Sequence, residues 1–128
     1  MKLLVTGGAG FIGSQVAAAY LARDHQVVIV DNLSSGKREN VPAGARFVQL
    51  DIRDRAGIDA LFALERFEMV NHHAAQIDVR KSVADPRHDA ECNALGLLNL
   101  LESCRAYGAL KFIFVSSGGV IYGEPQKL

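Results

Sequence analysis

Residues 1–14 read MKLLVTGGAGFIGS, and this stretch decides the fold. The apolar run LLV indicates a short buried strand, and from Phe11 to Arg23 apolar residues recur at helical spacing. Between them Gly7, Gly10 and Gly13 fall three apart. In this setting the first glycine permits a tight turn, the second lets the backbone approach a pyrophosphate, and the third lets the helix pack against the strand. The N–H groups at the start of the helix would then hold the phosphates.

A carboxylate at the end of the next strand supports this interpretation. Residues 26–30 read QVVIV, which is typical of a buried parallel strand, and Asp31 follows directly, 18 residues after Gly13. The expected interval is about 20 residues, and a carboxylate there accepts the ribose hydroxyls of an adenosine and repels a 2′-phosphate. We therefore expect NAD rather than NADP as the cofactor. Lys37 and Arg38 follow in the loop, and their charges would weaken the discrimination.

The rest of the chain alternates strands with helices. Further strands are expected at residues 46–50, 68–72 and 111–115, with a loop over 32–44 that holds at most a short helix. One helix follows Asp54, and a long one follows Asp85 and ends at Gly108. This alternation predicts an α/β fold, a doubly wound parallel sheet of five strands in the order 3-2-1-4-5, with ligands at the switch between the first and fourth strands.

Helical periodicity also predicts which side chains point inward. In the first helix these are Ile12, Val16, Ala17, Tyr20 and Leu21. In the helix after Asp54 they are Ile58, Leu61, Phe62 and Leu64, and in the long helix Ala94, Leu97, Leu98, Leu101 and Cys104.

Composition places the 128-residue chain among ordinary globular proteins, at 49% hydrophobic and 22% charged residues. Fourteen basic residues balance fourteen acidic ones, which argues against a nucleic-acid or anionic-membrane partner. No run approaches the roughly 18 apolar residues of a membrane span, and no signal peptide is evident. Cys92 and Cys104 would lie ~18 Å apart on one helix, too far for a disulfide, which favours a cytoplasmic protein. His72 and His73 point to opposite faces of a strand, so we expect no metal site.

Six motifs in this order resemble the extended short-chain dehydrogenase/reductases, and among them the NAD-dependent UDP-glucose 4-epimerases. They are TGGAGFIGS (6–14), VDNLSSGKREN (30–40), LDIRD (50–54), HHAAQIDVRKSVADP (72–86), NALGLLNLLESC (93–104) and FIFVSSGGVIYGE (112–124). The resemblance spans the whole chain. It implies a Rossmann fold that is incomplete here: residues 1–128 would form the NAD-binding domain without its remaining strands and without the substrate-binding domain.

The resemblance also assigns site residues. Around the pyrophosphate and adenosine it places Phe11, Ile12, Asp31, Asn32, Leu33, Ser35 and Gly36, with Asp51 and Ile52 flanking the adenine. Toward the nicotinamide it places His73, Ala74, Ala75, Gln76, Asn93 and Ser116, with Ser117 as the catalytic hydroxyl and Ser116 as its alternative. From the residues alone, Asp51 and the serines are also compatible with simple capping or turn roles. Asn93 disfavours a helix interior, which indicates a hydrogen-bonding role.

The resemblance implies an isomerase that inverts C4 of a UDP-hexose through a 4-keto intermediate, as a homodimer at full length. The family's catalytic Tyr-x-x-x-Lys pair is absent; Tyr107 and Lys111 have that spacing, but Gly108 between them ends the helix. We therefore expect the chain alone to be inactive. Gly118 and Gly119 stand where the dehydratases of this family have an Asp-Glu pair, which argues against a dehydratase. A UDP-glucuronate decarboxylase or a related epimerase is a second alternative. A non-catalytic NAD-binding module is the third alternative, should the natural chain end at Leu128.

Overall fold

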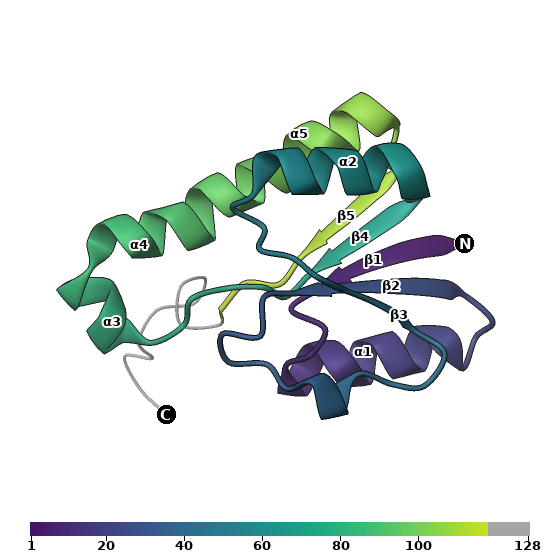
Figure 1. Cartoon of the computed structure of the whole chain (residues 1–128), viewed down its shortest axis with the longest axis horizontal. Helices are drawn as coiled ribbons and strands as arrows, with labels where there is room; N and C mark the ends of the chain where they lie inside the picture. Colours follow the sequence, from purple (N-terminus) through teal and green to yellow (C-terminus); the bar gives the residue numbers. More distant parts are fainter. Residues whose placement is uncertain (118–128) are drawn as a thin grey trace, which may run out of the picture.

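A computed structural model of the chain describes residues 1–117. Its five strands form one parallel sheet in the order β3-β2-β1-β4-β5 (Figure 1), which confirms the predicted order. The strands are β1 (Lys2–Thr6), β2 (Gln26–Asp31), β3 (Arg46–Gln49), β4 (Met69–His72) and β5 (Lys111–Phe114). The helices are α1 (Phe11–Leu21), α2 (Arg55–Glu65), α3 (Val79–Ala84), α4 (Pro86–Ala90) and α5 (Gly96–Tyr107), with a 3₁₀ turn η1 (Arg38–Asn40) and a π-helical turn η2 (Glu91–Leu95).

Helices cover both faces of the sheet, with α1 on one side and α2 and α5 on the other (Figure 1). Alternate residues of each strand point to opposite faces of the sheet and so contribute to two separate hydrophobic cores. Leu3 and Val5 of β1 pack with Ala17 on the α1 side, whereas Leu4 packs with Phe62 and the other side chains on the α2–α5 side. Because the strands are parallel, their carboxyl ends meet at one edge of the sheet, the edge where ligands bind in folds of this kind.

The predicted helix ends at Asp54, Asp85 and Gly108 are confirmed, whereas the first helix ends at Leu21, two residues before the predicted Arg23. The Asp54 carboxylate accepts the N–H of Gly57 at 3.0 Å, and the Asp85 carboxylate accepts the N–H of His88 at 3.0 Å. Gly108 ends α5 with φ 76°, a left-handed conformation that favours glycine. Tyr107 therefore lies on a helix and Lys111 on a strand, and the Tyr107 hydroxyl donates to Asp59 at 2.9 Å.

The inward faces of the first two helices differ from the prediction. In α1 the buried residues are Gly13, Ser14 and Ala17, while Ile12 is 59% exposed, because only small side chains fit where this helix approaches the sheet closely. In α2, Leu64 is exposed and Glu65 is buried instead.

The long helix expected after Asp85 is three segments, α4, η2 and α5. The π-helical turn holds an extra residue, so the residues before and after it do not keep one common helical face. The predicted inward Leu98 is 52% exposed, and Ala94 and Leu101 are also exposed. The predicted inward Cys104 is buried, and α5 also buries Gly96, Leu100 and Ser103, which were not predicted.

Candidate cofactor site

The glycine loop lies at the carboxyl end of β1 and is packed backbone to backbone. Gly7 has φ 66°, and a Cβ there would come within 2.7 Å of the Ala74 nitrogen. A Cβ on Gly13 would come within 2.3 Å of the Gly7 carbonyl oxygen, so the first turn of α1 rests directly on the loop. At Gly10, in contrast, a Cβ would meet only the Gly7 oxygen, at 3.1 Å. The loop is therefore closely packed at Gly7 and Gly13 and less closely packed at Gly10.

The N-terminus of α1 is available to a ligand. Within residues 1–117 no side chain caps it, and its first turn holds no acidic residue. The side chains of Phe11 (86% exposed) and Ile12 project outward rather than covering the turn. Free N–H groups and the positive end of the helix dipole make this turn suited to an anionic group.

Asp31 connects the end of β2 to the glycine loop. Its carboxylate is buried and accepts the N–H of Ala9 at 3.0 Å and that of Leu33 at 2.8 Å. Gly36 lies directly against it, since a Cβ there would come within 2.9 Å of both carboxylate oxygens. The Asp31 carboxylate thus connects the glycine loop to the loop that follows β2.

The loop after β2 is fixed at a second point. The Ala9 carbonyl accepts the N–H of Lys37 at 3.0 Å and the side-chain amide of Asn40 at 2.9 Å. The guanidinium of Arg38 lies over the Phe47 ring, 4.2 Å from its centre. Asn32 and Ser35, both predicted near the ribose, are exposed in this loop, and Leu33 is half-buried with φ 59°.

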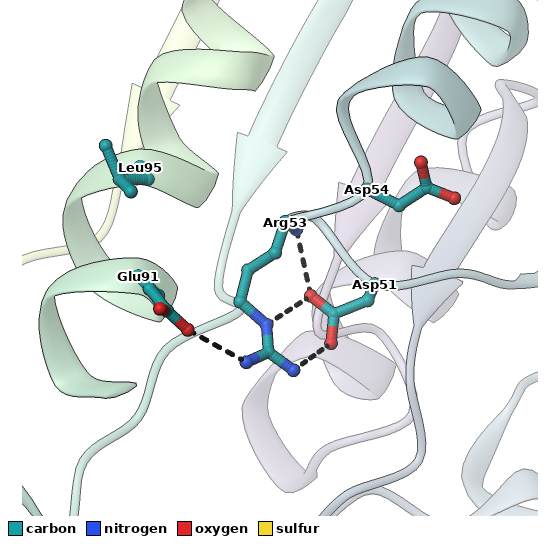
Figure 2. Close-up of a pocket in the computed structure, with 5 residues that line it drawn as sticks. All are labelled: Asp51, Arg53, Asp54, Glu91 and Leu95. Atoms are coloured by element: carbon teal, nitrogen blue, oxygen red, sulfur yellow. Dashed lines mark hydrogen bonds and ion pairs between the residues drawn. The ribbon is translucent and has the colours of Figure 1, made fainter. Parts of the chain in front are cut away.

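Asp51 follows β3 and holds a polar cluster beside an open pocket of about 480 Å³ (Figure 2). Its carboxylate accepts Nε and Nη2 of Arg53 at 3.0 and 2.8 Å, and the Asn32 side-chain amide at 2.8 Å. Arg53 also pairs with Glu91 of η2 at 3.7 Å. The Arg53 guanidinium holds the pKa of the Asp51 carboxyl well below its usual range, so this group is an anion at neutral pH. Ile52 is 7% exposed and packs into the core, and its carbonyl accepts the Asn99 side-chain amide at 2.9 Å, so this residue presents little surface to a ligand.

The segment after β4 is held at both ends. Near its start, the Thr6 hydroxyl oxygen accepts the N–H of Ala74 at 3.3 Å. Near its end, the Asn93 amide accepts the N–H of Gln76 at 2.8 Å and donates to the Gln76 carbonyl at 2.9 Å. The Asn93 amide nitrogen also donates to Asp89 at 3.0 Å, which fits the predicted hydrogen-bonding role of this helix-internal asparagine.

His73 and Ala75 lie within that segment. Among the described residues, the buried Nε2 of His73 has no hydrogen-bond partner, and burial lowers the pKa of this ring below its usual value. Ala75 is exposed. An orphaned buried nitrogen at the same sheet edge as an uncapped helix N-terminus is consistent with a polar ligand there.

Ser116 and Ser117 follow β5 at the same edge and are both exposed. Gly118, Gly119 and Tyr122, which belong to the motif that follows these serines, lie outside the described residues.

The predicted residues therefore gather from separate parts of the chain at the carboxyl edge of the sheet. Sequence reasoning missed the Arg53 and Glu91 partners of Asp51 and the pairing of Thr6 with His72. The spacing Asp51-x-Arg53 was visible in the motif LDIRD, but the distant Glu91 and His72 partners left no local signal.

Comparison with known proteins matches residues 3–128 to the NAD dependent epimerase/dehydratase family. The chain belongs to this family. A relative named putative UDP-glucose 4-epimerase, from Methanocaldococcus jannaschii, is 46% identical over 126 residues, which cover 98% of the chain and 41% of the relative. The chain thus spans about two fifths of the length of such relatives.

Solved structures of family members share the fold. The Thermus thermophilus UDP-glucose 4-epimerase in complex with NAD is 54% identical with a TM-score of 0.93, covering 98% of this chain and 41% of that one. The Thermotoga maritima UDP-glucose 4-epimerase with UDP-glucose is 49% identical with a TM-score of 0.94, covering 100% of this chain and 41% of that one. Among residues 1–117, no helix is long and apolar enough to cross a membrane.

Proposed function

We propose that this chain is the NAD-binding part of a UDP-glucose/UDP-galactose 4-epimerase. One observation carries the proposal. The N-terminus of α1, which no described side chain caps, directly follows Ala9, and the Ala9 N–H donates to the buried Asp31 carboxylate. This connection sets a site for an anionic diphosphate beside a site for ribose hydroxyls, which is the arrangement that a dinucleotide requires. The similarity to epimerases solved with NAD and with UDP-glucose supports the choice within the family.

Each group of residues has a role in this proposal. The backbone of Gly10, Phe11 and Ile12 holds the pyrophosphate, and Asp31 orients the adenosine ribose and repels a 2′-phosphate. The open pocket beside Asp51 takes the adenine, while the segment from His73 to Gln76 lines the path to the nicotinamide.

Bound NAD would supply a hydride acceptor for the sugar C4 and a hydride donor for the opposite face of the resulting 4-keto sugar. Ser117, or its neighbour Ser116, lies at the strand end where a hydroxyl can share the proton of the sugar O4. The residues that this proposal leaves to the rest of the enzyme are a tyrosine base and its lysine, together with the sugar-binding domain. A homodimer and a cytoplasmic location belong to the same proposal.

The experiment is carried out on the complete product of the coding sequence that contains this chain. We expect it to bind NAD more tightly than NADP by calorimetry and to convert UDP-galactose into UDP-glucose. Asp31→Asn keeps one carbonyl oxygen as an acceptor but turns an amide N–H₂ toward one of the two backbone donors, Ala9 or Leu33. It should weaken NAD binding by about 10- to 100-fold, the effect of losing a charge-assisted hydrogen bond. The exposed Asp78→Asn, at the start of α3, is the matched control.

Three results bear on the alternatives. Conversion of UDP-glucuronate to a pentose product instead of C4 inversion would point to a decarboxylase. NAD binding without either reaction, in a coding sequence that contains no Tyr-x-x-x-Lys after Leu128, would leave an NAD-binding module. Absence of NAD binding would overturn the proposal altogether.

A further inference from the structure

A buried pair of side chains, Thr6 and His72, lies at the switch point of the sheet. The two residues face each other in register at the carboxyl ends of β1 and β4. The Thr6 hydroxyl oxygen and Nδ1 of His72 are 2.7 Å apart, and both residues are almost completely buried. The site described above does not use His72.

Hydrogen-bond accounting assigns the proton between them. The Thr6 hydroxyl oxygen also lies 3.2 Å from the backbone nitrogen of His73 and 3.3 Å from that of Ala74. Both N–H groups donate to the hydroxyl oxygen, that of His73 while also donating to the Thr6 carbonyl at 3.1 Å, so the hydrogen of the hydroxyl is left to point at Nδ1 of His72. His72 is therefore a neutral imidazole that accepts at Nδ1 and carries its hydrogen on Nε2.

The surroundings of His72 keep it in this form. Its ring lies 5.9 Å from that of Phe114 in a stacked arrangement and 5.8 Å from that of Phe112, centre to centre. Burial, and secondarily the neighbouring His73, lowers the pKa of His72 to about 4, so Nδ1 remains an acceptor at neutral pH.

The contact matters because it connects two segments that pack against each other. Ala74 lies against the glycine loop so closely that a Cβ on Gly7 has no room. The Thr6 hydroxyl belongs to the strand that leads into the glycine loop and also holds the first residues after β4. Its direction therefore bears on how the segment after β4 is held against the glycine loop.

We propose that His72 is a positioning residue for the cofactor. By accepting the hydrogen of the Thr6 hydroxyl, it directs the lone pairs of that oxygen toward the backbone N–H groups of His73 and Ala74. The segment 73–76 is thereby held in place against the glycine loop. The inference rests on the proposed NAD-binding function. It makes no claim that His72 touches the cofactor.

The test compares two replacements of His72 in the complete gene product. His72→Asn keeps an acceptor where Nδ1 stands, whereas His72→Leu keeps apolar volume but removes the acceptor. We expect His72→Leu to raise the Kd for NAD about tenfold, the effect of one lost buried hydrogen bond, and His72→Asn to stay within about threefold of the wild type. Faster amide hydrogen exchange at Ala74 should accompany only the leucine variant.

A second pair, Thr6→Val and Thr6→Ser, asks the same question from the other side and serves if His72→Leu does not fold. Thr6→Val should weaken NAD binding as His72→Leu does, whereas Thr6→Ser should leave it unchanged. If the two residues act as one unit, the double variant Thr6→Val/His72→Leu should raise the Kd for NAD by less than about twofold over Thr6→Val alone. If both leucine and valine variants lose stability but keep the wild-type Kd, the pair is only structural and the inference is wrong. If the wild type fails to bind NAD, the proposed function fails instead.

Discussion

Acidification should weaken this fold through His72. The pKa of the ring lies near 4 in the folded chain against 6.5 for an unperturbed histidine. Between these values the unfolded chain binds a proton that the folded chain excludes, so the free energy of unfolding must fall as the pH drops from 6.5 toward 4. A tenfold difference in proton affinity between the two states corresponds to about 1.4 kcal/mol, so His72 alone should remove about 3 kcal/mol of stability over this range.

The measurement is urea unfolding at several pH values between 7 and 4, on the wild type and on His72→Leu. The variant lacks the titrating ring, so its stability relative to the wild type should improve by about 3 kcal/mol across the series. Ring proton shifts of His72 followed by NMR should show a midpoint near 4. Parallel stability curves for the two proteins, or a midpoint near 6.5, would refute the assignment of a neutral buried ring.

Three further perturbations test the framework of the site. Gly13→Ala should cost about 1–3 kcal/mol of stability because its methyl group would overlap the Gly7 carbonyl. Gly10→Ala should cost less stability, because its methyl group would meet one atom, the Gly7 oxygen at 3.1 Å, and should lose NAD affinity; denaturation and calorimetry on both variants separate these effects. Glu65→Gln should cost about 1–2 kcal/mol in urea unfolding, because the buried carboxylate pairs with Lys2 and Arg46, and an unchanged midpoint would contradict this. Asp54→Ala should cost about 1 kcal/mol through loss of the α2 cap, with the exposed Glu39→Ala as a surface control; equal losses would argue against the cap.

The sequence was sufficient for the parts of the structure that depend on local signals. The glycines after β1, the β-branched run of β2 and the caps at Asp54 and Asp85 all act within a few residues of themselves. Strand order followed because right-handed crossovers leave few arrangements for alternating strands and helices. These features are confirmed in the fold.

Helix faces were harder to predict because periodicity shows how often apolar residues recur but not which of them meet the sheet. In α1 the period favoured the large Ile12 as an inward residue, yet close approach to the glycine loop admits only Gly13, Ser14 and Ala17. In the helix after Asp85 the π-helical turn changed the phase, so a single period could not describe both halves.

Polar partners were the least predictable part of the site. Arg53 meets Asp51 two residues away, which the motif made visible, but its other partner Glu91 comes from a distant turn. The Thr6 and His72 pair joins residues 66 positions apart, and only the register of β1 on β4 brings them together.

The Ala9 peptide links two parts of the molecule that a protein engineer would wish to change separately. The Ala9 N–H donates to Asp31, and the Ala9 carbonyl accepts from Lys37 and Asn40. This one residue therefore connects the glycine loop to the loop after β2, which would discriminate between dinucleotides. A redesign of dinucleotide preference by replacing Asp31 alone would also free the Ala9 N–H and disturb the neighbouring loop. Changing the preference of such a protein is therefore a problem of rebuilding two loops together, with Ala9 as the pivot between them.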